Sequence, residues 1–124
     1  MRFLPTSIHG VIDYLWGLAL FASPWVLGFS DVPEAKWVAV VFGVGAILYS
    51  VFTAYEVGVL RIVPMPLHLV LDGVAGMLLA ASPFVLGFSD QVYLAHLLFG
   101  LFSIVASLVT RMEVTLVTGR REPV

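Results

Sequence analysis

The sequence predicts an all-α protein, a bundle of four transmembrane helices built from two tandem two-helix repeats. The first observation is composition: 60% of the 124 residues are hydrophobic, 11% are charged, and the mean hydropathy is +1.05. Soluble domains are much more polar than this. The second is length, since four apolar segments each reach about 20 residues, which matches a hydrocarbon core about 30 Å thick. The third is an internal repeat that divides the chain into two similar halves.

The repeat is clearest at the end of each half. Residues 22–31 return as residues 81–90, at an offset of 59 (81 − 22 = 59). One position differs, where Trp25 of the first copy is replaced by Phe84 in the second. The similarity extends upstream and includes His, Asp, Pro and Gly, which a merely apolar background would not match. We therefore interpret the chain as two copies of one unit.

Each unit of about 60 residues is too small to bury a large core alone, so the two units must share an interior. We expect one membrane domain, residues 1–124, with repeats at about 5–58 and 64–115. The apolar segments lack the charged stripe that a surface helix of a soluble bundle carries. Their apolar runs are continuous rather than alternating, which excludes strands of a transmembrane barrel.

The four elements follow in order along the chain. The first contains Asp13 and is too long for the apolar region of a signal peptide, so we expect it to be retained. The second starts with Asp31 as N-cap, Glu34 at capping-box spacing and Pro33 in the first turn. The third and fourth repeat this hairpin with a shorter connection. The expected spans are residues 8–29, 36–55, 67–88 and 93–112.

A Ser-Pro motif lies near the end of the first and third spans. Each proline lacks an N–H and clashes with the preceding turn, so we expect a kink or a helix end there. The glycine four residues after each proline is suited to a left-handed C-cap, and the aromatic residue beside each proline suits the membrane interface. We interpret the motif as a turn-shaping device without a ligand. Its residues are Ser23, Pro24, Trp25 and Gly28, with Ser82, Pro83, Phe84 and Gly87.

Short connections make each repeat an antiparallel hairpin. Two spans return the chain to its starting side, so both repeats have the same orientation, related by a pseudo-two-fold axis along the membrane normal. Lys36 alone lies on the opposite side of the membrane from the other basic residues. Because basic residues concentrate on the cytoplasmic side, we expect a multi-pass protein of the cell (inner) membrane with cytoplasmic N- and C-termini. Those other residues are Arg2, Arg61, Arg111, Arg120 and Arg121.

Polar residues recur within the spans. His9 and Asp13 are four residues apart, as are His68 and Asp72, so each pair projects from one helix face. We expect each pair to meet the end of the second helix of its own hairpin, giving two equivalent clusters in one polar belt near Arg61 and Arg111. The residues expected there are Thr53 and Glu56 in the first repeat, and Thr110 and Glu113 in the second.

Two interpretations of the belt remain open. The favoured one is structural, in which His, Asp, Thr and backbone carbonyls hydrogen-bond one another and fix helix register. The other is a metal site or proton relay, because imidazole and carboxylate are suitable ligands and exchange protons near pH 7. The candidate ligands are His9, Asp13, His68, Asp72, Glu56 and Glu113. His96 stands alone, and we expect it to be an interfacial hydrogen-bonding residue.

The remaining sequence features limit the function. There is no cysteine, and the net charge of −2 leaves no basic stripe for nucleic acid. No phosphate-binding loop, nucleophile elbow or zinc-protease motif is present, so we expect no catalytic residue, no cofactor and no enzyme activity. We expect a structural or accessory subunit that associates laterally in the lipid bilayer, with itself or with a membrane-protein partner. The alternative is a small transporter, channel or metal-dependent membrane protein that uses the polar belt.

Ser23-Pro24-Trp25 and its second copy, each preceded by a His-x-x-x-Asp on the same span, resemble the SPW repeat family of small prokaryotic integral membrane proteins. The similarity covers about residues 5–114. It implies a two-helix repeat, often duplicated to four spans, and it implies no activity. The chain departs from the family pattern at Phe84, where the second copy has no tryptophan and hence no indole N–H.

Overall fold

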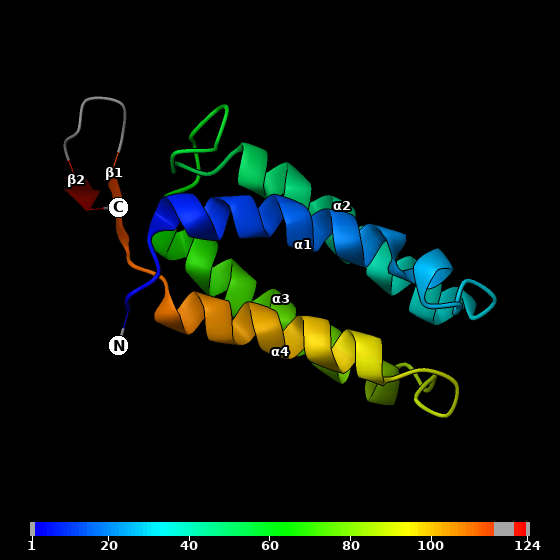
Figure 1. Ribbon diagram of the computed structural model, residues 1–124. Coiled ribbons are helices and arrows are strands. Elements are labelled where there is room, and N and C mark those ends of the chain that lie inside the picture. The colour runs from blue at the N-terminus through cyan, green and yellow to red at the C-terminus, as the bar shows by residue number, and fades with distance from the viewer. Residues whose placement is uncertain (1, 116–120, 124) are drawn as a thin grey trace.

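The computed structural model describes residues 2–115 and 121–123, which form four helices and one short pair of strands (Figure 1). The helices confirm the predicted all-α class, and the antiparallel strands add a small element that was not expected. Arg120 lies outside the described residues. The elements are α1 (Thr6–Val26), α2 (Pro33–Val51), α3 (Met65–Val85), α4 (Leu94–Val109), β1 (Glu113–Thr115) and β2 (Arg121–Pro123).

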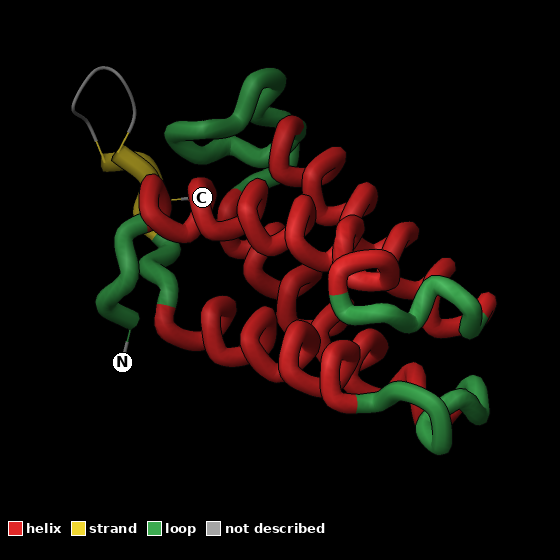
Figure 2. Tube along the Cα trace, turned by 45° about the vertical axis from the view of Figure 1, so that its right-hand side comes forward, coloured by secondary structure: helices red, strands yellow, loops and turns green. Residues whose placement is uncertain are grey.

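The helices form two hairpins, α1 with α2 and α3 with α4, that lie side by side in an elongated bundle (Figures 1 and 2). The connections 27–32 and 86–93 lie together at one end, which we call the loop end. The N-terminal residues, the segment 52–64 and the strands lie at the other, which we call the terminal end. The predicted short connections therefore produce the predicted antiparallel hairpins.

The Ser-Pro motif ends α1 two residues after Pro24, as expected. A proline has no N–H for the carbonyl four residues earlier, which here belongs to Leu20. The Ser23 hydroxyl donates to that carbonyl at 2.7 Å and so replaces the missing donor. Gly28 follows at φ +80°, and the N–H of Phe29 donates to the Pro24 carbonyl, which completes a Schellman cap.

The second copy of the motif ends α3 in the same way. Ser82 donates to the Leu79 carbonyl at 2.7 Å, and Gly87 has φ +79°. The N–H of Phe88 donates to the Pro83 carbonyl at 2.9 Å. The serine of the motif therefore pairs the carbonyl that the proline leaves without a donor, and both predicted glycine caps are confirmed.

The expected N-cap of α2 is wrong. Val32, not Asp31, is the N-cap residue, and it makes no side-chain capping bond. Pro33 occupies the first turn, as predicted, and a residue before proline is driven into the extended conformation that an N-cap requires. Val32 has φ −98° and ψ 98° for this reason, so the proline fixes the helix start one residue later.

Two backbone bridges seal the terminal end. Leu4 forms a parallel bridge with Thr110, and Thr53 forms one with Val63. These pairs correspond in the two repeats, since 63 − 4 = 59 and 110 − 53 = 57. The segment before the first helix of each repeat therefore pairs with the end of the second helix of the other repeat. Because the backbone turns to form these bridges, α2 and α4 end earlier than the expected spans.

Glycines bring the backbones of each hairpin into contact. A Cβ added at Gly43 would lie 2.7 Å from the Gly17 carbonyl oxygen, and one added at Gly76 would lie 2.6 Å from that of Gly100. No side chain fits between helices at this separation. Close backbone approach at small residues is a common way for helices to pack in a membrane.

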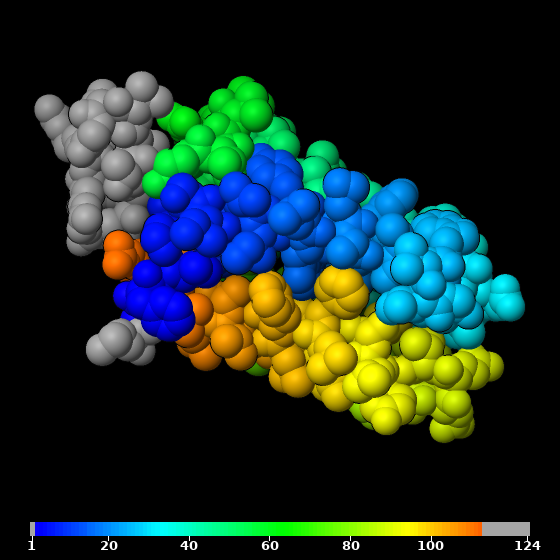
Figure 3. Space-filling view, viewed as in Figure 1, coloured from blue at the N-terminus to red at the C-terminus, as the bar shows by residue number. Residues whose placement is uncertain are grey.

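The outer faces of all four helices are apolar. Leu15, Val41, Val70 and Leu108, one from each helix, are 59–63% exposed. Figure 3 shows the face formed by α1 and α4. Among the described residues, α2 and α3 are long and apolar enough to cross a membrane. The polar residues are instead concentrated between the helices.

Candidate functional site

Four ionisable side chains meet between α1 and α3 near the terminal end. His9 and Asp13 project from α1, and His68 and Asp72 project from α3; we call these four residues the His/Asp cluster. Three are buried and Asp13 is nearly so. The spacing of four residues correctly predicted that each pair shares a face. The two faces turn toward each other.

Each imidazole contacts both carboxylates. Nε2 of His9 lies 2.8 Å from Asp72 Oδ2 and 3.1 Å from Asp13 Oδ1. Nε2 of His68 lies 2.9 Å from Asp13 Oδ2 and 3.3 Å from Asp72 Oδ2. In each case the shorter contact crosses from one repeat to the other. The cluster is therefore one shared unit, and the expectation of two separate clusters is wrong.

The threonine partners are also exchanged between repeats. Nδ1 of His9 lies 2.6 Å from Oγ1 of Thr110, and Nδ1 of His68 lies 2.6 Å from Oγ1 of Thr53. We expected each histidine to meet the threonine of its own hairpin. The exchange arises because the bridges at the terminal end place the start of each hairpin beside the end of the other.

Two tyrosines that the sequence analysis missed complete the cluster. Tyr49 on α2 donates to Asp72, and Tyr55 in segment 52–64 donates to Asp13 Oδ2 at 2.9 Å. Burial and the Asp13 carboxylate raise the pKa of the Tyr55 phenol, so its hydroxyl remains a donor. Tyr49 lies four residues before Thr53, a spacing that would place both on one face of the expected span 36–55 and was the available signal. No periodic pattern marks Tyr55.

Of the two predicted glutamates, Glu56 is not part of the cluster. Glu56 accepts hydrogen bonds from the Thr6 hydroxyl at 2.8 and 2.9 Å. Glu113 begins β1, and its side chain lies outside the described part of the chain. Arg61, expected as a counter-ion of the belt, donates to the backbone carbonyls of Gly58 and Glu56, each at 3.3 Å.

Segment 52–64 covers the cluster from the terminal end. Its Tyr55 is fully buried, and the Tyr14 hydroxyl on α1 holds the segment by donating to the Val57 carbonyl at 2.9 Å. Gly10 leaves the space that the Val57 side chain occupies. The cavity beside the cluster measures only about 10 Å³, which is at most the space for one water.

A different polar group lies near the loop end. His96 on α4 is fully buried between the rings of Phe29 and Phe88, with centroid distances of 5.2 and 4.9 Å. Its Nε2 donates to the Ala35 carbonyl at 3.0 Å, which joins α4 to α2. The expected hydrogen bonding is confirmed, and the ring is buried inside the bundle.

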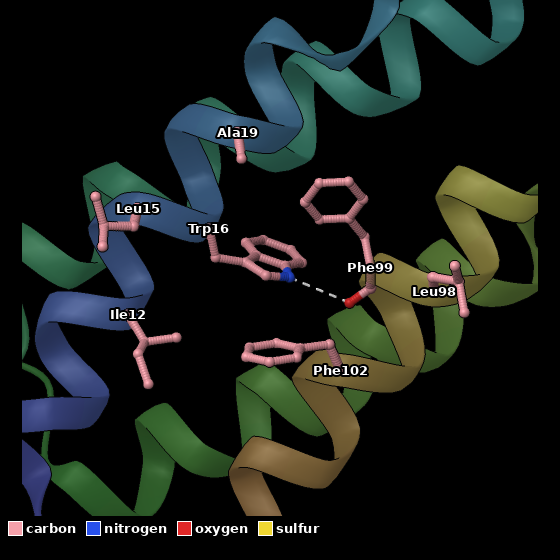
Figure 4. A pocket seen from close by; sticks show the side chains of 7 residues that line it. All are labelled: Ile12, Leu15, Trp16, Ala19, Leu98, Phe99 and Phe102. Atoms are coloured by element: carbon pink, nitrogen blue, oxygen red, sulfur yellow. Dashed lines mark hydrogen bonds between the residues drawn. The ribbon is translucent and has the colours of Figure 1, made fainter. Parts of the chain in front are cut away.

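An apolar groove of about 470 Å³ runs along the outside of the bundle between α1 and α4 (Figure 4). The indole N–H of Trp16 donates to the Phe99 carbonyl at 3.2 Å and bridges the groove floor. A groove of about 380 Å³ lies between α2 and α3. The motif residues Trp25 and Phe84 also face outward and are more than half exposed.

The comparisons with known proteins agree with the resemblance read from the sequence. The model of the SPW repeat domain matches residues 7–110. No curated protein and no solved structure matches the chain. The matched domain and the two apolar helices α2 and α3 together indicate a membrane protein.

Proposed function

The chain belongs to the SPW repeat family, and we propose that it is a four-span protein of the cell membrane that acts without catalysis through lateral association. Its partner is a second copy of itself or another membrane protein that it serves as an accessory subunit. The observation that supports this proposal best is the polarity of the helices. Their outer faces are apolar, whereas the histidines and aspartates point inward and bind one another.

The same observation supports spanning by α1 and α4 as well. Apart from Tyr14, the ionisable residues of α1 are His9 and Asp13, and both turn toward α3. α4 has 16 residues, but its ends continue into the backbone bridge at Thr110 and the connection at Tyr93. Buried and paired polar side chains are the usual condition under which a membrane helix tolerates them.

A pseudo-two-fold axis along the membrane normal is supported by repeated local geometry. Pro5 and Pro64 precede α1 and α3 with the same angles, φ −62° and ψ 147°. The serine bonds and the glycine caps also occur once in each repeat. The backbone bridges and the histidine–threonine bonds occur as corresponding pairs between the repeats. Two hairpins of like orientation would repeat contacts in this way.

For orientation, we propose that the terminal end faces the cytoplasm. Arg2, Arg61 and Arg111 lie at this end, and Lys36 lies at the loop end. Positive residues concentrate on the cytoplasmic side of membrane proteins. Cysteines at Val32 and Gln91 should react with an impermeant reagent in intact cells, and a cysteine at Leu60 should not. The reverse labelling would contradict this orientation.

Lateral association is tested by mass measurement after purification in mild detergent. The expected particle contains more than one copy, or one copy with a co-purifying membrane protein; a bare monomer would contradict the proposal. Ala19 lines the groove between α1 and α4, so Ala19→Phe should fill it and weaken an association that uses this face. Leu18→Phe adds bulk to an exposed position of the same helix outside the groove and is the matched control.

A channel or transporter would need a route past the polar residues. The cavity at the His/Asp cluster holds about one water at most, and the carboxylates are engaged by histidine and tyrosine. We therefore propose that the cluster is a joint that fixes how the two hairpins meet. Proton flux through liposomes that contain the protein, abolished by Asp13→Asn/Asp72→Asn, would overturn this assignment.

A further inference from the structure

The His/Asp cluster has a feature that a hydrogen-bonded joint does not require. One ligand atom from each of His9, Asp13, His68 and Asp72 lies within 4.8 Å of all the others. A pairwise joint needs each imidazole to meet one carboxylate, but here each Nε2 lies within 3.3 Å of both. The four ligand atoms therefore form one compact group.

The hydrogen bonds around the cluster fix where the histidine protons lie. The Thr110 hydroxyl donates to the Ala106 carbonyl at 2.6 Å, and the Thr53 hydroxyl donates to the Tyr49 carbonyl at 2.6 Å. A hydroxyl has a single hydrogen, so each threonine oxygen must accept from the Nδ1–H of its histidine. The Nε2 atoms are thereby directed at the carboxylates.

Lone pairs on Nε2 and on carboxylate oxygens repel one another unless something positive lies between them. Two protons, one for each imidazole, meet this need and leave the four residues neutral as a set. One divalent cation meets it equally well, because its two charges balance two carboxylates while both imidazoles stay neutral. Neutrality matters here, since an uncompensated charge within a membrane bundle is costly.

The spacing of the four atoms also suits a metal ion. Ligands at the usual zinc distances of about 2.0–2.1 Å lie roughly 3.3 Å apart in a tetrahedron. The imidazole–carboxylate contacts of 2.8–3.3 Å are close to this spacing, and the wider separations among the four atoms, at most 4.8 Å, would have to shorten to reach it. The hydrogen bonds to the four residues from their neighbours also match a metal site. Metal-binding histidines donate their other N–H to an oxygen, and metal-binding carboxylates accept further hydrogen bonds.

We propose that His9, Asp13, His68 and Asp72 form a closed site for one divalent transition-metal cation of the Zn²⁺ type. Binding forms four bonds, two to Nε2 atoms and two to carboxylate oxygens, and releases two protons to water. Imidazole and carboxylate together favour Zn²⁺ over Mg²⁺ or Ca²⁺, which prefer oxygen ligands alone. The ion would tie α1 to α3, and hence the two hairpins to each other, which goes beyond the lateral association proposed above.

The test uses the full chain without an affinity tag, dialysed against a chelator in detergent, equilibrated with Zn²⁺ and desalted. Elemental analysis should find about one Zn²⁺ per chain. Asp13→Asn/Asp72→Asn keeps the shape and hydrogen-bonding capacity of both side chains but removes both anionic ligands, so it should lose the ion while its helical circular dichroism persists. Wild-type protein without zinc, or a variant that retains it, would overturn the proposal.

The matched control is Asp31→Asn/Asp90→Asn. It makes the same change at two repeat-related aspartates that are exposed at the loop end, and it should leave the zinc content unchanged. If the cluster variant fails to fold, X-ray absorption of the zinc-loaded wild type still decides. Scattering from two imidazoles at about 2.0–2.1 Å is expected, and a spectrum without imidazole would overturn the site. Failure here would not alter the mass measurement that tests lateral association.

Discussion

The terminal end and the loop end of the bundle each contain buried histidine, and they use it differently. At the terminal end, His9 and His68 engage both ring nitrogens and share two carboxylates. At the loop end, His96 meets one backbone carbonyl and two aromatic rings, and its Nδ1 has no hydrogen-bond partner among the described residues. The first arrangement holds exchangeable positive charge, and the second suits a neutral imidazole packed as a ring.

The difference also follows the repeat. His9 and His68 are each other's counterpart in the repeat, at an offset of 59. His96 instead corresponds to Ala39, at an offset of 57 (96 − 39 = 57). Ala39 is fully buried, so the first repeat has no room for a second ring at that position. Duplicated polar residues therefore join the repeats through mutual side-chain bonds, and the single His96 joins them through one bond to a backbone carbonyl and through ring packing.

Removing one carboxylate of the His/Asp cluster at the terminal end should cause the largest loss of stability. Asp72→Leu removes the nearer acceptor of His9 Nε2 and the acceptor of the Tyr49 hydroxyl. Breaking a buried pair in this way costs about 3–5 kcal/mol. Denaturation in detergent, followed by helical circular dichroism, measures the loss. Asp90→Leu, at an exposed position, is the control, and equal stability of the two variants would contradict the comparison.

The glycine contact between the two ends should give the next largest effect. A Cβ at Gly76 would lie 2.6 Å from the Gly100 carbonyl oxygen, so Gly76→Ala forces α3 and α4 apart at a cost of about 1–3 kcal/mol. Nothing lies within 4 Å of a Cβ added at Gly45. Gly45→Ala should therefore be neutral or stabilising by up to about 1 kcal/mol. Thermal unfolding of both variants in the same detergent provides the measurement.

The exchanged threonine bonds can be tested by a double-mutant cycle. Thr110→Val removes the acceptor of the His9 Nδ1–H and should cost about 1–2 kcal/mol. Combined with His9→Phe it should show coupling, and combined with His68→Phe it should add nearly independently. Coupling of Thr110 with His68, the histidine of its own repeat, would contradict the exchange and show that each threonine bonds the histidine of its own hairpin.

The smallest effect is expected at the loop end. His96→Leu keeps an apolar side chain between Phe29 and Phe88 and removes one hydrogen bond to a helix carbonyl. A net hydrogen bond contributes only about 1 kcal/mol, and the better packing of leucine offsets part of it. The same denaturation assay measures this change beside His68→Leu. A larger loss for His96→Leu than for His68→Leu would reverse the proposed roles of the two ends.

Much of the fold could be predicted because its signals are local. Repeat spacing, apolar length and the glycine after each Ser-Pro pair identified four helices, two hairpins and the left-handed caps at Gly28 and Gly87. The predicted capping box at Asp31 was an equally local signal, but it was wrong because Pro33 controls the conformation of the residue before it and makes Val32 the N-cap. Where two local signals compete, the covalent restriction of proline outweighs a side-chain hydrogen bond.

The site was less predictable because its contacts are not local. A spacing of four residues places His9 and Asp13 on one face, but it does not say which hairpin that face meets. Both possible partners, Thr53 and Thr110, lie just after α2 and α4 at the same end of the bundle, so the sequence pattern fits either pairing. The exchange depends on the bridges from Leu4 and Val63, which are backbone contacts and leave no side-chain signature.

The exchanged contacts impose an order on biosynthesis. The first hairpin leaves the ribosome before the second, and at that stage His9 lacks both Asp72 and Thr110. The guanidinium of Arg2 also lacks its hydrogen bonds at that stage, because its acceptors are the carbonyls of Ser107 and Thr110 at the end of α4. The N-terminal residues can take their final places only after the last helix has been translated and inserted. Until then the nascent first hairpin exposes unsatisfied polar groups, so chains truncated before α4 should be substrates for membrane quality-control proteases.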